Sequence, residues 1–515
     1  MLFNSYEFLI FLACVLVGFY LALRVSRGAA NWLLLGASAF FYAWWDAKVV
    51  LLLFGSVLIN YLLGMVIAGQ VRRGLPRRLP LTVGIVFNLA LIGWFKYAAF
   101  VAGTIGSMMD RQLDIGDVVL PLGISFFTFQ QITYLVDTAR GTEARAGFRD
   151  YALYVTFFPQ LIAGPIVHHG EMLPQLRSER ARRVMRDLSL GLTIFVIGLF
   201  KKVVLADSFA PYADGVFGLA AAGTVPGMID AWIGVLAYTF QIYFDFSGYS
   251  DMAVGLARMF GIRLPLNFFS PYKAQGIIEF WRRWHISLSR FLRDYLYIPL
   301  GGSRRGRGTQ FFNILITMAI GGLWHGAGWT FVFWGALHGV LIVGNHLLRR
   351  VTGYDPRRHR RSPLRRAVFV AITFGLIALT WVPFRATGFD AAMNVYAGMF
   401  GIGGMVLPEV MQRIPGLGAV LAQLPVTWVD DLVAVDRLSV LWLMAGFLVV
   451  WAMPNTVQIT ARHRPVLDPT LVVSGRAPAP LIWRPTRAWA LSVGAMATLA
   501  LLQLSEVSPF LYFQF

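Results

Sequence analysis

Apolar runs long enough to enter a lipid bilayer recur from one end of this sequence to the other, and they constrain its fold more than any other feature. They occupy residues 7–23, 49–68, 81–95, 188–206, 225–244, 311–324, 328–347, 367–384, 438–454 and 488–503. Several reach or approach the roughly 17–25 residues that a helix needs to cross the hydrocarbon core. The pattern predicts an all-α, polytopic membrane protein with roughly ten to twelve membrane segments, not all of which need to span.

The composition supports the same fold class. Of the 515 residues, 57% are hydrophobic and 14% are charged, whereas soluble domains carry about 25% charged residues. The net charge of +19 comes from arginines in the loops between apolar runs. That distribution is typical of cytoplasmic loops facing anionic lipid headgroups, so we expect membrane lipids as partners and no nucleic acid.

The first apolar run, residues 7–23, is expected to be a retained helix. It has no basic segment before it and no small-residue cleavage site before Arg24 and Arg27, as a signal peptide would. The single cysteine, Cys14, lies inside this run. Disulfides and cysteine–zinc sites are therefore excluded.

The basic loops also predict an orientation. Arginines follow the runs 7–23 and 49–68, and segment 349–366 holds eight arginines and one aspartate, so these loops are expected in the cytoplasm. Loop 386–437 is acidic and is expected outside, as are both termini. The stretch "YALYVTFFPQLIAGPIV" (151–167) lies between two arginine clusters. Its prolines and glycine predict a segment that enters the membrane and returns, with a single proline-kinked span as the alternative.

Polar side chains inside an apolar run mark a first candidate site. In "QIYFDFSGYSDMAVGLARM" (241–259), Asp245 and Tyr249 are four residues apart, as are Ser247 and Asp251, so each pair shares a helix face. The two aspartates are about 120° apart around a helix and do not form a carboxylate dyad. These side chains either bond neighbouring helices or line a cavity.

A second candidate, "EFWRRWHISLSRFLRDYLYIPLGG" (279–302), is predicted to form an amphipathic helix at the membrane interface. At about 100° per residue, its aromatic and leucine residues lie on one face and its arginines on the other. The apolar face holds Trp281, Trp284, Leu288, Phe291, Leu292 and Tyr295, and the opposite face holds Arg282, Arg283, Arg290 and Arg293. His285 falls near the seam, where an ordinary interfacial histidine is equally compatible. The basic face is suited to an anionic ligand, such as the phosphates of an activated donor.

The third candidate is "GGLWHGAGWTFVFWGALHG" (321–339), which places His325 and His338 in an apolar setting. Its glycines favour either close backbone packing or a break between two helices. On one continuous helix the two histidines would be about 220° apart and would not share a face. No metal-binding, P-loop or nucleophile-elbow motif is present, but a neutral imidazole in a wet cavity is a good general base.

Five long motifs occur in one order along the chain: "FFPQLIAGPI" (157–166), "YFDFSGYSDMAVGL" (243–256), "NFFSPY" (267–272), and the second and third candidates above. This set resembles the membrane-bound O-acyltransferase family, and within it the branch of the bacterial alginate O-acetylases. The teichoic-acid D-alanyl transferases are more distant. The resemblance covers most of residues 1–350.

The resemblance implies an enzyme that moves an acyl group from a thioester to a hydroxyl through a transmembrane tunnel. It implies that His325 is the catalytic histidine and that His285 is its companion. His338 is outside those two motif positions and is expected to be structural or tunnel-lining. The further candidates for the substrate path are Asp245, Tyr249, Asp251, Trp284, Trp324, Arg282 and Arg283. We expect no metal and no bound cofactor, with acetyl-CoA as the acyl donor.

The predicted function is acetyl transfer for the O-acetylation of an exported polysaccharide, in the inner membrane of a bacterium. Periplasmic acetyltransferase-like proteins and exopolysaccharide machinery are the implied partners. Acyl or D-alanyl transfer to peptidoglycan, teichoic acid or a small molecule is the alternative, and a transporter has little support because no repeats are visible. We expect a single domain over 1–515, with the motifs in about 120–345, an external loop at 386–437 and helices in 438–503.

Overall fold

A computed structural model gives the fold. It describes the whole chain except residues 112, 114, 117, 143–146, 179–183, 354–361, 410–411, 413–420, 422–425, 430–432, 435, 468–476, 505–509 and 512–515. The contacts between residues divide the chain into two compact units. Unit 1 comprises Met1–Phe200, Gly248–Asn267 and Thr456–Gln514, and unit 2 comprises Lys201–Ser247 and Phe268–Asn455 together with the last residue. The predicted single domain over 1–515 stays a prediction.

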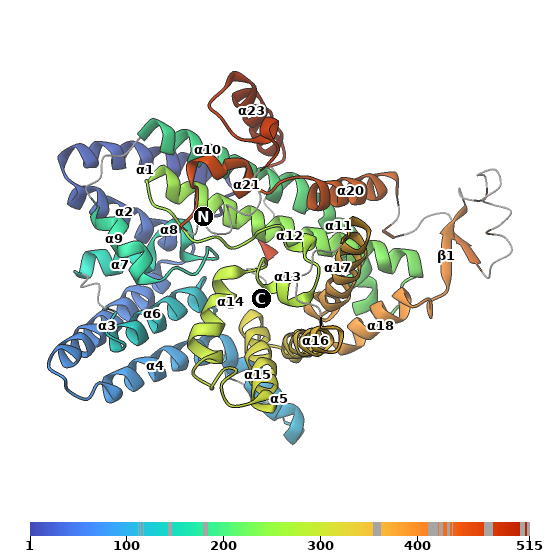
Figure 1. Cartoon of the computed structure of the whole chain (residues 1–515), viewed down its shortest axis with the longest axis horizontal. Helices are drawn as coiled ribbons and strands as arrows, with labels where there is room; N and C mark the ends of the chain where they lie inside the picture. The colour runs from blue at the N-terminus through green and yellow to red at the C-terminus, as the bar shows by residue number, and fades with distance from the viewer. Residues whose placement is uncertain are drawn as a thin grey trace. The chain divides into compact units, whose positions relative to one another are not determined.

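Unit 1 is helical in its described part (Figure 1). Its helices are α1 (Tyr6–Val25), α2 (Arg27–Ala43), α3 (Ala47–Arg72), α4 (Arg78–Ile92), α5 (Ala98–Met109), α6 (Ile124–Ala139), α7 (Phe148–Thr156), α8 (Phe158–Leu161), α9 (His169–Arg177), α10 (Val184–Phe200), α21 (Thr456–Thr460) and α23 (Arg487–Leu502). Short polar residues fix several starts: the Ser5 side chain accepts from the Phe8 amide, and that of Asp46 accepts from the Lys48 amide.

The described residues of unit 2 form helices and one two-stranded sheet. Its helices are α11 (Asp207–Ala221), α13 (Ile277–Trp281), α14 (Ile286–Leu292), α15 (Arg307–His325), α16 (Trp329–Thr352), α17 (Pro363–Arg385), α18 (Phe389–Met399) and α20 (Arg437–Phe447). Helix α12 (Met228–Met259) contributes residues to both units. Strands β1 (Met405–Pro408) and β2 (Val426–Val429) pair in parallel, with Met405 opposite Val426. Short π-helical segments lie at Gly93–Tyr97, Lys201–Ala206, Arg293–Tyr297 and Leu448–Ala452, and 3₁₀ turns at Pro271–Lys273, Ala461–His463 and Ala479–Leu481.

Six helical segments in the described part of the chain are long and apolar enough to cross a membrane, or seven if a bent pair forms one span. They are Tyr6–Val25, Ala47–Arg72, Arg78–Met109, Val184–Ala221, Trp329–Thr352 and Pro363–Arg385, and the bent pair is Arg437–Ala452 with Thr456–His463. The other predicted runs also form helices, in α12, α15 and α23. The all-α, polytopic membrane fold predicted from the sequence is confirmed.

The segment 151–167 does not form one continuous helix. Helix α7 ends at Thr156, the four-residue α8 follows around Pro159, and irregular backbone leads from there to α9. The segment is buried throughout. Irregular backbone at membrane depth is stable when protein covers it, so the observed burial fits the predicted interruption. That the segment enters the membrane and returns stays a prediction, as does the alternative of a kinked span.

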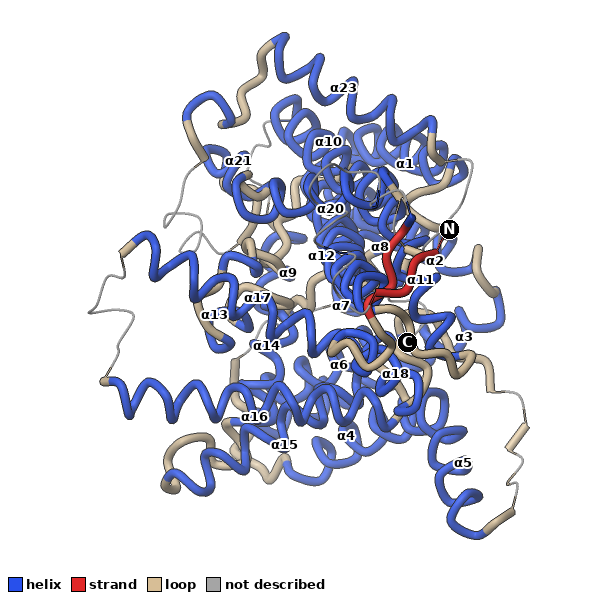
Figure 2. The backbone as a smooth tube through the Cα atoms, turned by 90° about the vertical axis from the view of Figure 1, so that its right-hand side faces the viewer, coloured by secondary structure: helices blue, strands red, loops and turns tan. Residues whose placement is uncertain are grey.

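Helices α15 and α16 form a tight pair in unit 2, and they lie side by side in both views (Figures 1 and 2). The chain leaves helical conformation at Gly326 and re-enters it at Trp329. A Cβ atom at Gly322 would overlap the carbonyl oxygen of Phe331, and one at Gly335 would overlap that of Met318. The glycines therefore serve both predicted purposes, because they allow the backbones to approach and they accompany the break.

Candidate active site

The two histidines expected to act together lie next to each other in unit 2. Their ring centroids are 6.0 Å apart, and the ring planes are inclined at 61°. Both side chains are buried, His285 with 0% and His325 with 4% of its surface exposed. His325 is the last residue of α15, and His285 lies between α13 and α14 in left-handed backbone conformation, with φ 44° and ψ 52°. Such strain in a non-glycine residue is typical of functional sites.

Aromatic side chains surround the pair. Phe246 and His285 form a T-shaped pair at 4.8 Å between centroids, and Trp324 contacts both histidines, at 5.8 Å from His285 and 5.0 Å from His325. Trp334 and Phe384 also pack against His325, at 5.2 and 5.4 Å between centroids. Burial lowers the pKa of the His285 imidazole, which lies outside the candidate spans, so this ring is neutral at physiological pH.

The predicted continuous helix over 279–302 is wrong. Helix α13 ends at Trp281, and α14 begins at Ile286. The Arg283 and Trp284 amides both donate to the Phe280 carbonyl, at 2.8 Å, and the Phe269 amide donates to the Arg283 carbonyl at 2.9 Å. These bonds hold a turn that reorients the chain just before His285. A calculation of helical faces that assumes a regular 3.6-residue repeat cannot place side chains across such a turn.

The predicted apolar face is half-buried at its two ends, Trp281 and Tyr295, and buried between them at Trp284, Leu288, Phe291 and Leu292. The arginines have different surroundings. Trp284 is buried and packs on Phe268 at 5.0 Å and on Trp381 at 5.1 Å between centroids. Arg282 is exposed, whereas Arg283 forms a 2.6 Å ion pair with Glu279. A role for Arg282 and Arg283 in holding an anionic ligand stays a prediction.

Asp245 belongs to a buried charge cluster in unit 2 that the sequence alone did not reveal. Lys202 Nζ lies 2.9 Å from Asp245 Oδ1 and 2.7 Å from Asp207 Oδ1, and the Lys202 and Asp245 side chains are each 2% exposed. Lys202 falls inside the predicted run 188–206. A lysine inside such a run, together with an aspartate directly after the end of the run 225–244, is the signal that could have identified this pair.

Tyr249 and Asp251 lie on the part of α12 that belongs to unit 1. The Tyr249 ring stacks on Phe3 at 4.9 Å and meets Phe510 edge-on at 4.6 Å. Thr456 Oγ1 donates to Asp251 Oδ2 at 2.5 Å, which connects α12 to α21. These contacts favour the helix-packing interpretation of both residues, and their role in the substrate path stays a prediction.

His338 lies on α16 and is fully buried. Its Nδ1 is 3.2 Å from Trp281 Nε1, and because an indole nitrogen only donates, Nδ1 accepts this hydrogen bond. The separation of about 220° that one continuous helix would give does not apply, because the helix breaks at Gly326, which is the alternative that the glycines also allowed. Trp334 packs against both rings, at 5.2 Å from His325 and 4.7 Å from His338.

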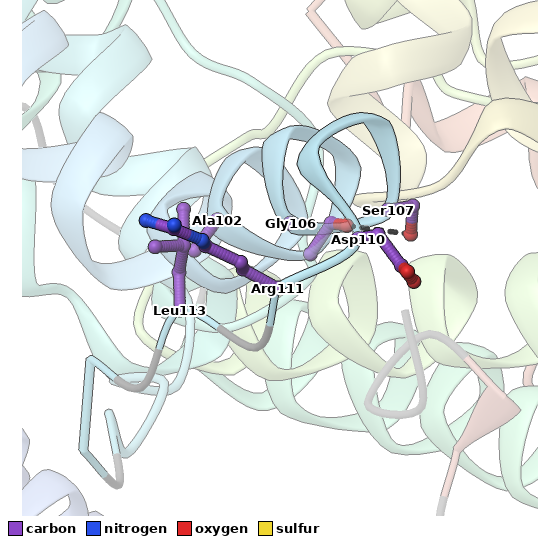
Figure 3. A pocket seen from close by; sticks show the side chains of 7 residues that line it. Ala102, Gly106, Ser107, Asp110, Arg111 and Leu113 are labelled. Carbon is purple, nitrogen blue, oxygen red and sulfur yellow. Dashed lines mark hydrogen bonds between the residues drawn. The ribbon is translucent and has the colours of Figure 1, made fainter.

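A separate pocket of about 590 Å³ lies in unit 1, at the C-terminal end of α5. Figure 3 shows the side chains that line it, among them Ser107, Asp110 and Arg111. Its described lining includes none of the residues predicted for the active site.

Comparison with known proteins identifies the chemistry of this fold. The profile of the membrane-bound O-acyltransferase family matches residues 139–382, which contain both histidines of the pair. The probable alginate O-acetylase of Pseudomonas putida is 38% identical over 523 residues, covering 100% of both chains. The chain belongs to the membrane-bound O-acyltransferase family. It is therefore a multi-pass membrane acyltransferase.

Two further relatives show how the family's named activities vary. The peptidoglycan O-acetyltransferase of Helicobacter pylori is 42% identical over 438 residues, or 79% of this acyltransferase and 81% of that protein. The teichoic acid D-alanyltransferase of Streptococcus thermophilus is 26% identical over 290 residues, or 51% and 68% of the two chains. The resemblance stated from the motifs is thus confirmed, and both transferase branches are similar to this chain.

Proposed function

We propose that this acyltransferase moves acetyl groups from a cytoplasmic thioester, acetyl-CoA, across the inner membrane for the O-acetylation of an exported polysaccharide. The observation that carries the proposal is the approach of His285 and His325, 6.0 Å apart in buried aromatic surroundings. Relatives named for the acetylation of alginate and of peptidoglycan support a sugar polymer as the final acceptor.

His325 acts as the general base in this proposal. It takes the proton of the acceptor hydroxyl while the hydroxyl oxygen bonds to the acyl carbon and the carbon–sulfur bond of the donor breaks. The proton then passes from His325 to the thiolate that leaves. His285, neutral because of its burial, orients a substrate or donates a hydrogen bond to the oxyanion that develops on the acyl carbonyl.

The final polymer need not enter the membrane domain. We propose that periplasmic acetyltransferase-like proteins receive the acetyl group and pass it to the polysaccharide. The direct acceptor is then a serine hydroxyl of such a protein, which contacts the acidic loop 386–437. Residues 430–431, two of the aspartates on which the acidity of this loop rests, lie outside the described residues.

Peptidoglycan is the second acceptor that a specific observation favours, because the relative named for it is 42% identical. The two acceptors predict different products in the same host. Acetyl esters would appear in the secreted polysaccharide in the first case and in the isolated cell wall in the second.

The test is the ester-linked acetyl content of both fractions in cells whose own gene is deleted and replaced by a variant. His325→Ala should lower acetylation at least about a hundredfold, because general-base catalysis contributes roughly 10²–10⁴-fold. The variant should still insert into the membrane in normal amount. Wild-type acetylation by His325→Ala would refute the proposed role of this histidine.

The matched control is His463→Ala, which removes a half-buried imidazole that packs on Trp483 at 5.0 Å in unit 1. It should retain acetylation. For the donor, inverted membrane vesicles given labelled acetyl-CoA should incorporate label with the wild-type protein and not with His325→Ala. The absence of incorporation from acetyl-CoA by the wild-type protein would exclude this donor route.

A further inference from the structure

His338 has contacts that a histidine used only for packing would not need. Its Nδ1 accepts the Trp281 hydrogen bond, and the two rings meet edge-on at 5.2 Å between centroids and 84°. This bond connects the last residue of α13 to the middle of α16. Because Nδ1 must carry a lone pair to accept, the ring is neutral and its single proton is on Nε2.

Through Trp281, His338 contacts the segment that presents His285. Trp281 precedes His285 by four residues, and the intervening turn is closed by the bonds from the Arg283 and Trp284 amides to Phe280. Because these hydrogen bonds restrict the conformation of the turn, the position of Trp281 determines the position of the His285 backbone.

Through Trp334, His338 also contacts the surroundings of His325. Trp334 lies one turn before His338 on α16, with 4.7 Å between their ring centroids. Trp334 also meets His325 in a T-shaped contact, at 5.2 Å between centroids and 89° between ring planes. Trp334 also stacks on Trp381 at 5.7 Å, and Trp381 packs on Trp284, next to His285 in the chain. One aromatic cluster thus joins both segments that carry the site histidines.

We propose that His338 is a positioning residue for acyl transfer. It accepts the hydrogen bond from the Trp281 N–H and packs against Trp334, and it thereby holds the rings of His285 and His325 in their relative positions. This inference rests on the proposed roles of those two histidines. Misplacement of a reacting group by about 1 Å can cost roughly a hundredfold in rate, so loss of one such bond affects the chemical step more than substrate binding.

The experiment removes the hydrogen bond without removing the ring. Trp281→Phe keeps an aromatic side chain and deletes the N–H. His338→Asn and His338→Leu are close in shape, but only asparagine offers an acceptor near the position of Nδ1. Rates are measured in inverted vesicles over a series of labelled acetyl-CoA concentrations. We expect kcat to fall about tenfold in Trp281→Phe and His338→Leu, with KM within about twofold, and His338→Asn to recover most of the loss.

The matched control is Trp232→Phe. Trp232 Nε1 donates to the Met399 carbonyl at 3.0 Å in the same unit, so this change deletes an equivalent bond that does not involve the histidine pair. Its kcat should be that of the wild type. The double variant Trp281→Phe/His338→Leu should be no slower than His338→Leu alone, because Trp281→Phe removes the same hydrogen bond.

Wild-type kcat in Trp281→Phe, or multiplied losses in the double variant, would overturn the inference. An equal loss in His338→Asn and His338→Leu would also do so, because it would indicate packing alone. These outcomes are distinct from failure of the proposed function, which is read from His325→Ala. If His325→Ala is inactive and Trp281→Phe is normal, only the positioning role is lost.

Discussion

At the scale of single residues, His285 and His338 differ in backbone conformation. His285 has φ 44°, a conformation that costs a side chain with a Cβ about 1–2 kcal/mol relative to glycine. His338 lies inside α16, where glycine is less stable than alanine by about 0.5–1 kcal/mol. A glycine should therefore be more stable than an alanine at position 285 and less stable than an alanine at position 338.

We expect His285→Gly to be more stable than His285→Ala by about 1 kcal/mol, and His338→Gly to be less stable than His338→Ala by a similar amount. Each comparison removes the same ring from both variants, so lost packing cancels. The measurement is thermal unfolding of the detergent-solubilised proteins. A His285→Ala variant as stable as His285→Gly would mean that this backbone is not left-handed.

The sequence motifs single out His285 and His325 but not the contacts between them. The 6.0 Å approach depends on the turn after Trp281 and on the left-handed conformation of His285, and hydrophobic periodicity carries no information about either. Trp334 and Phe384 are inconspicuous for another reason. Tryptophan and phenylalanine are frequent in membrane helices, and only the close packing of α15 on α16 and the course of α17 bring them to His325.

At the scale of elements, the pairing of α15 with α16 depends on glycine. Gly335 faces the backbone of Met318, with no flexible side chain between them that can move aside. Gly335→Ala should force the helices apart, at a cost of about 1–3 kcal/mol, and should displace Trp334 from His325. We expect lower thermal stability and at least tenfold lower acetyl transfer.

The control for this prediction is in the same helix. Gly344 has open space where a Cβ would be, so Gly344→Ala should keep full activity and gain up to about 1 kcal/mol from the better helix former. Equal thermal stability and equal acetyl transfer in Gly335→Ala and Gly344→Ala would show that the contact of Gly335 with Met318 does not determine the packing of α15 on α16.

The cluster of Lys202, Asp207 and Asp245 gives a second prediction at this scale. Lys202→Met would leave the buried Asp245 carboxylate without its cation, which typically costs about 3–5 kcal/mol. Adding Asp245→Asn should restore part of that stability. By comparison, Arg293→Gln removes an exposed pair with Asp294 and should change stability by less than about 1 kcal/mol. Thermal unfolding compares Lys202→Met, Lys202→Met/Asp245→Asn and Arg293→Gln. A double variant less stable than Lys202→Met would contradict the pairing of Lys202 with the buried Asp245 carboxylate.

At the scale of the whole molecule, long apolar runs predict the helices well because lipid leaves few other structures for such segments. The apolar runs predict the positions at which helices are interrupted less well. The interruption in 151–167 was predictable from Pro159, Gly164 and Pro165, and the break after His325 was predictable from Gly326 and Gly328. The break after Trp281 has neither residue, since its turn is closed by backbone hydrogen bonds and by Phe269, distant in sequence. The division into two units, each built from separate stretches of chain, also has no local sequence signal.

The orientation predicted from the arginines is open to a direct test, because Cys14 is the single cysteine and Cys14→Ser gives a cysteine-free background. Leu75 lies in the basic loop after α3, and Thr387 lies at the start of the acidic loop 386–437; both are exposed. The excess of arginine around Leu75 should hold that loop in the cytoplasm. In spheroplasts, a membrane-impermeant maleimide should label Thr387→Cys at once and Leu75→Cys only after lysis. The reverse pattern would invert the topology and would place the acidic loop on the side of the donor, where it could not meet a periplasmic acceptor.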